Sequence, residues 1–223
     1  MQILVFGKDG QLGKAFQQQF EQTPLEKFGV QVQLIGRSDC DLANPQEMIA
    51  LLGRVKPNVI INAAAYTAVD QAESEPELAH AINARAPQLM AQYAVENGAT
   101  LLHYSTDYVF DGGKTGVYIE SDLRNPLSQY GKSKADGEQA IEEVFKKASK
   151  GQYAILRTSW VYGDGGNFIR TILRLAKERE ALNIIQDQLG VPTSAQWLAA
   201  VSLDFIFNGE WQIQKITSGI YHA

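Results

Sequence analysis

Short apolar runs alternate with amphipathic segments along this chain. A strand that is covered on both faces is almost wholly apolar, whereas a helix packed on a sheet carries apolar residues three or four apart. The first pattern predicts strands at 3–6, 30–35, 59–65, 100–104, 153–162, 182–185 and 218–223. The second predicts one helix that begins near residue 12 and further helices at 44–54, 76–97, 128–148, 167–180 and 194–207. Strands and helices in alternation predict an α/β fold with a doubly wound, mainly parallel sheet.

Residues suited to helix termini support these boundaries. Pro45 stands in the first turn of its helix, where proline is tolerated. Gly98 follows the 76–97 segment as a C-cap. Thr193 or Ser194 is the expected N-cap of the last helix.

The first apolar run leads directly into the glycine-rich turn Gly-Lys-Asp-Gly-Gln-Leu-Gly at 7–13. After such a strand, Gly7 and Gly10 would let backbone N–H groups approach a pyrophosphate at the positive end of the following helix. Gly13 would allow that helix to pack closely on the strand. The spacing is G-x-x-G-x-x-G rather than G-x-G-x-x-G, and an ordinary strand–helix turn is the alternative. The context predicts a Rossmann-like, dinucleotide-binding domain.

The ends of the second and third strands carry further candidates for cofactor contact. In dinucleotide folds an acid at the end of the second strand binds the ribose 2′-hydroxyl, whereas an Arg suits a 2′-phosphate. Here Arg37 follows Gly36, which predicts NADPH; a solvated surface Arg is the alternative. Asp41 and Leu42 are placed to frame an adenine. The small side chains at the end of the third strand, where a flat ring or a ribose could lie against the backbone, are Ala63, Ala64 and Ala65.

Tyr130 and Lys134 are four residues apart and therefore lie on one face of the 128–148 helix. An ammonium group near a phenol lowers the phenol's pKa from about 10, and the tyrosine can then pass a proton to a carbonyl oxygen at neutral pH. Thr106, just after the strand 100–104, is placed to hold the same oxygen. The spacing alone also arises by chance. Its weight comes from position, because ligands of such sheets bind outside the carboxyl ends of the strands, where these residues gather.

Composition narrows the cellular context. A net charge of −5 and a pI near 5.3 give no support for nucleic-acid binding. The single cysteine, Cys40, excludes an internal disulfide, fits a reducing compartment and is expected to be structural. No apolar run reaches the roughly 18 residues of a membrane span, so no membrane association and a cytoplasmic location are expected. His103 lies inside a predicted strand, where a core role is expected rather than a catalytic one.

Several stretches resemble the extended short-chain dehydrogenase/reductase superfamily and, within it, the dTDP-4-dehydrorhamnose reductase family. The resemblance covers residues 1–223. It is carried by the glycine turn and by Asn-Ala-Ala-Ala-Tyr-Thr-Ala-Val-Asp at 62–70, Ala-Glu at 72–73, His-Tyr-Ser-Thr-Asp-Tyr-Val-Phe-Asp-Gly at 103–112, Tyr-Gly-Lys-Ser-Lys at 130–134, Arg-Thr-Ser-Trp-Val-Tyr at 157–162 and Asp-Gln-Leu-Gly-Val-Pro-Thr at 187–193.

The resemblance implies a role for each matching residue. Tyr130 would be the proton donor, and Lys134 would bind the nicotinamide ribose and tune the phenol. Thr106 and Asp107 would contact the sugar nucleotide, with Thr106 assisting proton transfer, and Trp160 would line the substrate pocket. The implied cofactor contacts are Gly10, Gln11, Leu12, Asp41, Leu42, Ala65, Tyr66 and Thr67.

The implied reaction is hydride transfer from NADPH to C4 of dTDP-4-dehydro-L-rhamnose, which yields dTDP-L-rhamnose for cell-surface polysaccharide; NADH is the alternative donor. Members of the family often use Mg²⁺, in some cases at a dimer interface through a Glu just beyond the third glycine. Ala15 stands there. No metal ligand is therefore expected, and the resemblance leaves open both a Mg²⁺ requirement and a homodimer.

The resemblance also predicts two parts, a cofactor domain at 1–163 and part of a substrate-binding lobe at 164–223. The family's sequences continue beyond the point where this chain ends, so the lobe is expected to be small and incomplete. Among related enzymes, sugar-nucleotide dehydratases carry a Glu directly after the Thr-Asp pair, and Tyr108 here argues against dehydration. A non-catalytic NADP-binding regulatory subunit, like that of methionine adenosyltransferase, shares the fold and motifs and is the alternative function. NADPH oxidation by a dTDP-keto sugar would separate the two.

Overall fold

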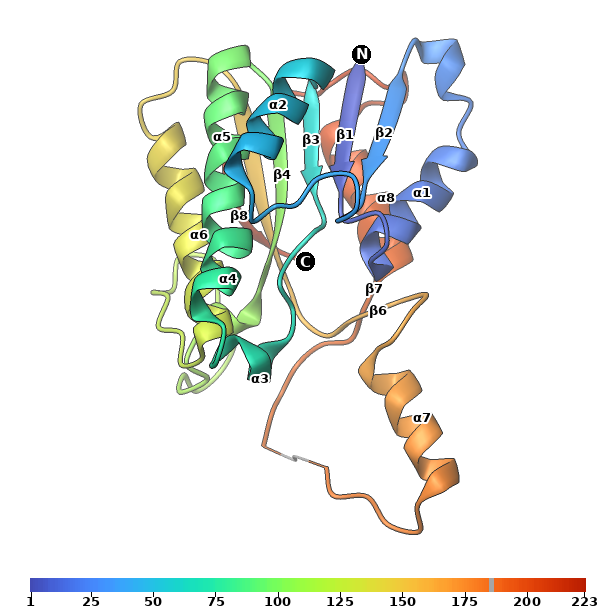
Figure 1. The fold of residues 1–223 in the computed structure, drawn as a ribbon, viewed down its shortest axis with the longest axis vertical. Coiled ribbons are helices and arrows are strands. Elements are labelled where there is room, and N and C mark those ends of the chain that lie inside the picture. Colours follow the sequence, from blue (N-terminus) through green and yellow to red (C-terminus); the bar gives the residue numbers. More distant parts are fainter. Residues whose placement is uncertain (185–186) are drawn as a thin grey trace.

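The computed structural model describes residues 1–184 and 187–223. Its centre is a six-stranded parallel sheet with helices on both faces, as the alternating pattern predicts (Figure 1). The strand order β2-β1-β3-β4-β5-β8 changes direction at β1, where a doubly wound sheet opens a crevice. The strands are β1 (Gln2–Phe6), β2 (Gln31–Ile35), β3 (Val59–Asn62), β4 (Thr100–Thr106), β5 (Gln152–Thr158) and β8 (Gly219–His222).

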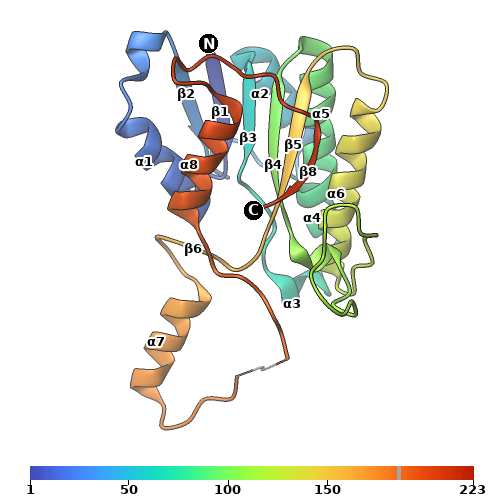
Figure 2. The same cartoon turned by 180° about the vertical axis from the view of Figure 1, so that it is seen from behind.

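The two faces of the sheet are covered by different helices. Helices α2 (Pro45–Val55), α5 (Ala86–Asn97) and α6 (Gln129–Phe145) cover one face (Figure 1), and α1 (Gln11–Glu21) and α8 (Ala195–Ile206) cover the other (Figure 2). Phe16 of α1 and Leu198 of α8 belong to the same core cluster, whereas Met48 and Met90 belong to the core on the opposite side. The inner strands β1, β3, β4 and β5 therefore bury both of their faces, which explains their continuous apolar runs, whereas the edge strand β2 exposes Gln31 and Gln33.

The predicted helix at 76–97 is continuous but changes its winding. It begins as α4 (Pro76–His80), widens to a π-helical turn at Ala81–Arg85 and continues as α5. Residue 87 is a proline and has no N–H to offer to the carbonyl of Asn83, four residues earlier. That carbonyl instead faces Gly137 of α6, where a Cβ would lie only 2.1 Å from the oxygen. The absent hydrogen bond and the close helix contact account for the local widening.

Two predicted strands end earlier than the apolar pattern suggests. The third strand ends at Asn62 rather than at residue 65. The run 153–162 is not one strand, because β5 ends at Thr158 and Trp160 has a φ of 43° in the left-handed region. The chain then forms β6 (Val161–Tyr162), which pairs with β7 (Thr193–Ser194) in a small separate sheet. The predicted strand 182–185 is also wrong over 182–184, which form no regular element, and its last residue lies outside the described residues.

The expected boundary at residue 163 requires a correction. Of the described residues, only 163–184 and 187–192, here called the protruding segment, stand away from the sheet, beyond the carboxyl ends of the strands; they include α7 (Phe168–Glu178) (Figures 1 and 2). Helix α8 instead packs in the core beside α1, and β8 adds a sixth strand next to β5. The physical reason is that α8 has an apolar face to bury and β5 has a free edge that a parallel strand can extend.

The remaining local elements are short. They are the 3-10 turns Leu25–Phe28 and Asp107–Val109, the latter η3, and helix α3 (Val69–Ala72). As expected, Ser194 is the N-cap of α8, Gly98 closes α5 in the left-handed conformation and Pro45 stands in the first turn of α2. The N-cap of α2 is Asn44. None of the helices described in 1–184 and 187–223 is long and apolar enough to cross a membrane.

Candidate active site

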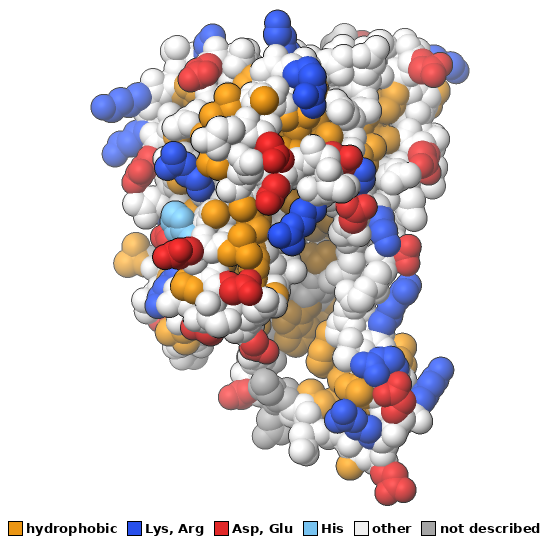
Figure 3. Space-filling model, viewed as in Figure 1, with side chains coloured by type: hydrophobic (Ala, Val, Ile, Leu, Met, Phe, Trp, Pro, Cys, Tyr) orange, Lys and Arg blue, Asp and Glu red, His pale blue; other side chains and the backbone are white. Residues whose placement is uncertain are grey.

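A cavity of about 1060 Å³ lies outside the carboxyl ends of the strands. Figure 3 shows it as a hollow with hydrophobic side chains on its walls, above the protruding segment. Except for Gly13, every residue that the sequence analysis singled out for cofactor, substrate or proton transfer is on its wall. These are Gly7, Gly10, Gln11, Leu12, Arg37, Asp41, Leu42, Ala63, Ala64, Ala65, Tyr66, Thr67, Thr106, Asp107, Tyr130, Lys134 and Trp160.

The glycine turn is built for close contacts between backbones. Gly7 has a φ of 92°, and a Cβ there would lie 2.7 Å from the backbone of Ala63. A Cβ on Gly13 would lie 2.0 Å from the carbonyl oxygen of Gly7, which explains why Gly13 is behind the turn rather than on the cavity wall. Helix α1 begins at Gly10 without a side-chain cap. Its first amides therefore remain available at the positive end of the helix, an arrangement suited to an anion.

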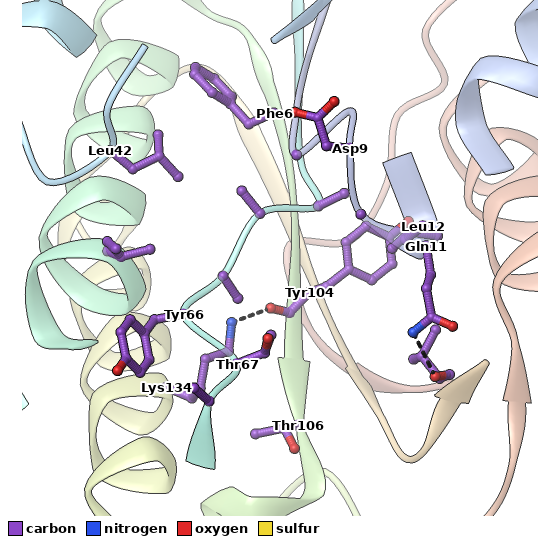
Figure 4. Close-up of a pocket in the computed structure, with 18 of the residues that line it drawn as sticks. Phe6, Asp9, Gln11, Leu12, Leu42, Tyr66, Thr67, Tyr104, Thr106 and Lys134 are labelled. Carbon is purple, nitrogen blue, oxygen red and sulfur yellow. Dashed lines mark hydrogen bonds between the residues drawn. The ribbon is translucent and has the colours of Figure 1, made fainter. Parts of the chain in front are cut away.

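Gln11 connects this turn to the protruding segment. Its Nε2 donates to the carbonyl of Val161 at 3.2 Å (Figure 4), and its Oε1 accepts from Asn167 Nδ2 at 3.1 Å. Asn167 is in turn the N-cap of α7. The side chain of Gln11 thus links the start of α1 to β6 and α7, a role that its place in the glycine motif did not indicate.

Charged groups gather at the end of β2, where the sequence indicated only Arg37. Lys8 and Asp39 form an ion pair of 2.5 Å, which raises the pKa of Lys8 and lowers that of Asp39. The carboxylate of Asp39 also accepts the N–H of Gly36 at 2.8 Å. A Cβ on Gly36 would meet the carboxylate of Asp9 at 2.3 Å. Cations and carboxylates therefore lie side by side at the end of β2. The sequence feature that could have indicated these additional charges is the Lys-Asp pair at 8–9, inside the glycine turn.

Tyr130 lies in the first turn of α6, which is held against η3. Ser128 caps α6 by accepting the N–H of Gly131 at 3.0 Å. A Cβ on Gly131 would lie 2.3 Å from the carbonyl oxygen of Tyr108, so this glycine permits the close approach. The rings of Tyr108 and Tyr130 meet edge to face with centroids 5.6 Å apart. These contacts bring the phenol of Tyr130 beside Thr106 at the end of β4.

The electrostatics of Tyr130 differ from the sequence-based expectation. Burial raises its pKa to about 12, a hydrogen bond with Thr106 acts in the opposite direction, and Asp107 and Tyr108 reinforce the rise. The pKa is therefore not lowered by Lys134. The ammonium of Lys134 instead donates to the carbonyl of Tyr104 at 2.6 Å (Figure 4).

Lys134 is only 2% exposed. Burial lowers its pKa to about 8, and Glu138 one turn further along α6 opposes this shift. Glu138 is fully buried and forms two hydrogen bonds with Arg157 of β5, at 2.9 Å from Nε and 2.7 Å from Nη2. This buried pair fixes α6 to the sheet. Sequence reasoning found Lys134 by its spacing from Tyr130 but had no local signal for the Glu138–Arg157 contact.

Asp107 connects the end of β4 to the stretch that follows β5 and leads into the protruding segment. It accepts from Thr106 Oγ1 at 3.0 Å and from Ser159 Oγ at 2.6 Å. Trp160, the next residue, is 42% exposed and its ring is tilted against Phe168 of α7 at 6.3 Å. A Cβ on Gly190 would lie 2.6 Å from the Trp160 ring, so this glycine allows the 187–193 loop to pack on the indole.

Asn83, which sequence reasoning missed, holds the part of the cavity wall that follows β3. Its side chain accepts the N–H of Tyr66 at 2.8 Å and donates to the carbonyl of Tyr66 at 3.0 Å and to Ser133 Oγ at 2.9 Å. The amide therefore holds the loop after β3 against α6. Among residues 1–184 and 187–223, no group of three or more His, Cys, Asp or Glu side chains is arranged to hold a metal ion.

A parallel doubly wound sheet, a glycine turn at an uncapped helix start, and a Tyr and Lys on one helix beside a strand-end Thr together define a Rossmann-like protein of the short-chain dehydrogenase/reductase class. Within this class the chain belongs to the family described as RmlD substrate binding domain, whose model matches residues 1–223.

Several of the similar proteins are named dTDP-4-dehydrorhamnose reductase. The chain is 41% identical over 224 residues to a dTDP-4-dehydrorhamnose reductase of Aggregatibacter actinomycetemcomitans, covering 99% of this chain and 72% of the relative. It is 46% identical over 201 residues to the Escherichia coli K12 protein of that name, covering 89% of this chain and 64% of the relative.

Two solved structures with the same name match the whole chain. The Clostridium acetobutylicum structure has a TM-score of 0.87 at 38% identity, and the Bacillus anthracis structure, in complex with NADP, has 0.84 at 35%. This chain covers 74% of each. It thus spans between 64% and 74% of the lengths of these four proteins.

Proposed function

We propose that this protein reduces dTDP-4-dehydro-L-rhamnose to dTDP-L-rhamnose with NADPH as the hydride donor. The observation that carries the proposal is that one cavity joins the glycine turn to Thr106, Tyr130 and Lys134. The chain is also 41% and 46% identical to two relatives named as that reductase. The alternative of a non-catalytic regulatory subunit is not favoured, because these relatives are named as enzymes.

The cofactor would lie along the strand ends from Arg37 to Lys134. The uncapped start of α1 fits a pyrophosphate, because an anion there meets free backbone amides at the positive end of the helix. Arg37 is exposed at the cavity wall and is the cation proposed for a 2′-phosphate. The bound nicotinamide would supply the hydride.

Tyr130 is proposed to supply the proton. With a pKa of about 12, its phenol remains protonated throughout the neutral range and holds the proton that a reduced carbonyl oxygen requires. An acid this weak transfers its proton slowly unless the phenolate is stabilised. The hydrogen bond from Thr106 acts in that direction, and Lys134 is the nearby cation proposed to assist it.

The sugar nucleotide is proposed to lie between the strand ends and the protruding segment. Thr106 and Asp107 present hydroxyl and carboxylate oxygens on that side, and Trp160 presents an exposed aromatic ring. Hydroxyl groups of the sugar would form hydrogen bonds with Thr106 and Asp107, and the apolar face of the sugar would pack on the ring of Trp160.

The test is NADPH oxidation in the presence and absence of dTDP-4-dehydro-L-rhamnose. Oxidation is expected to depend on the sugar nucleotide. Tyr130→Phe should lower turnover by about 10²–10⁴-fold, the usual weight of general acid catalysis, while NADPH binding remains. Tyr93→Phe, which removes a hydroxyl from α5 away from the cavity, is the matched control. Sugar-independent NADPH oxidation, or near-normal turnover by Tyr130→Phe, would contradict the proposal.

A further inference from the structure

Three polar side chains from three elements are buried together behind the cavity. They are Asn62 of β3, His103 of β4 and Lys134 of α6, with exposed fractions of 0%, 0% and 2%. Burying polar groups is costly unless each is hydrogen-bonded, so the direction of every contact matters here. His103 is a buried titratable group to which neither the expected chemistry nor the fold assigns a role.

The direction of the contacts can be followed from Asn62. Its Oδ1 accepts the backbone N–H of Ala64 at 3.3 Å, which orients the side-chain amide. Its Nδ2 then lies 3.0 Å from His103 Nδ1 and has only hydrogens to offer. The lone pair of Nδ1 is therefore engaged as an acceptor. A neutral imidazole whose Nδ1 accepts carries its proton on Nε2.

His103 remains neutral in this setting. Burial, and to a smaller extent the charge of Lys134, lower its pKa well below the ordinary value. Its Nε2–H faces Lys134 Nζ at a distance of 3.4 Å. A neutral amine can accept this hydrogen with its lone pair, whereas an ammonium group would set donor against donor. Meanwhile Nζ donates to the carbonyl of Tyr104 at 2.6 Å.

We propose that His103 is a positioning residue for Lys134, with its Nε2–H holding the amine against the Tyr104 carbonyl and opposing its protonation. The proposal rests on the function proposed above for the role of Lys134 in catalysis. His103 acts through Lys134 and does not conduct protons outward, because both it and Asn62 are fully buried.

The other groups around Lys134 are accounted for. Glu138 on the same helix favours the ammonium, but its carboxylate is paired with Arg157 of β5 and with Arg124. On the side of η3, Asp107 and Tyr108 act on the pKa of Tyr130. Burial, opposed by Glu138, leaves the pKa of Lys134 at about 8, low enough for a modest change in its surroundings to alter its charge near neutrality.

Two substitutions separate the two nitrogens of His103. His103→Gln places an amide N–H near the position of Nε2 and keeps a donor toward Lys134. His103→Asn places an amide oxygen near Nδ1, keeps the acceptor for Asn62 and removes the donor. The first readout is the pH titration of the labelled Lys134 side chain by NMR, a measurement that needs no substrate. The Lys134 signal is assigned by its loss in Lys134→Met. The second is the pH dependence of NADPH oxidation with the sugar nucleotide.

The expected result is that His103→Asn raises the pKa of Lys134 and His103→Gln leaves it close to the wild-type value. A rise of one unit from about 8 would multiply the protonated fraction at pH 9 about fivefold, and turnover at that pH should rise in proportion if the ammonium is the active form. Asn62→Asp, whose carboxylate would draw the imidazole proton to Nδ1, should raise the same pKa and serves if His103→Asn does not fold.

Equal titration of Lys134 in the two His103 variants, or an unchanged pKa in Asn62→Asp, would overturn the proposal. A shifted lysine titration in a protein that does not oxidise NADPH would instead uphold the role of His103 and refute the proposed reaction. The two failures are therefore distinguishable.

Discussion

Gly13→Ala tests the glycine turn without changing the surface of the cavity. Gly13 lies inside α1 with its Cα directed at the turn, and a Cβ there would be 2.0 Å from the Gly7 oxygen and 2.7 Å from Lys8 Cα. Ordinary contact begins at 3.4 Å, so the turn and helix must separate by about 1.4 Å, the difference between 3.4 and 2.0 Å. Both contacting atoms belong to the backbone, and no side chain can rotate away.

The size of the effect follows from two opposing terms. Alanine is favoured over glycine inside a helix by about 0.5–1 kcal/mol. Overpacking typically costs about 1–3 kcal/mol and more when only backbone can move. We therefore expect a net loss of about 1–3 kcal/mol, which in a protein of this size lowers the melting temperature by about 2–12 °C. NADPH affinity should fall at least about tenfold, equivalent to about 1.4 kcal/mol, because the displaced turn carries the amides proposed for the pyrophosphate.

Gly53→Ala is the matched control. Gly53 is an exposed residue inside α2 with nothing within 4 Å of the position of a Cβ. The same substitution should therefore raise the melting temperature by about 1–4 °C and leave NADPH binding unchanged. Thermal melts and isothermal titration with NADPH on both variants suffice. If Gly13→Ala melts like Gly53→Ala and binds NADPH with the wild-type Kd, the close approach at Gly13 does not support the turn.

Three further predictions concern charged groups. Arg37→Asp should reverse a preference for NADPH over NADH of about tenfold or more; equal Kd values for the two cofactors in the wild type would refute the role of Arg37. Lys134→Met should raise the melting temperature at pH 7. The pKa of Lys134 is about 8 in the folded protein and 10.5 ordinarily, so between these pH values the unfolded chain binds one proton more than the folded protein. The stability of the wild type therefore rises as the pH increases from about 8 to 10.5. The advantage of about 3 kcal/mol should shrink between pH 8 and pH 10, and a pH-independent difference would refute it. Arg157→Met leaves the fully buried Glu138 with Arg124 as its remaining partner, at 3.1 Å, and should cost about 3 kcal/mol, the lower end for a broken buried pair. Most of this loss should be recovered in the double variant with Glu138→Leu, as denaturant titrations would show.

Much of the cofactor half is determined by local sequence. The apolar runs that became β1 and β4 and the glycine turn between β1 and α1 are local patterns, and parallel strands place their carboxyl ends at one edge. Spacing was equally sufficient to place Tyr130 and Lys134 on one face of α6. These features were predictable because each depends on residues within a few positions of one another.

Other features depend on partners far apart in the chain, and only the tertiary structure decided them. Helix α8 joins the core beside α1, although the chain leaves the main sheet after Thr158 and α8 begins only at Ala195. Glu138 finds Arg157, and Asn83 holds Tyr66, through contacts that no spacing in the sequence indicates.

The charge states in the site show the same division. The sequence placed an ammonium near a phenol and predicted a lowered pKa for Tyr130, whereas the folded protein raises it to about 12. Proximity along a helix can be read from sequence spacing, but the pKa also depends on how much water the whole fold removes from the phenol. It depends as well on where Nζ of Lys134 is held, here against the carbonyl of Tyr104 and 3.4 Å from Nε2 of His103, both in β4. Sequence therefore determined which groups meet at the strand ends, and the packing of distant segments around them determined their protonation.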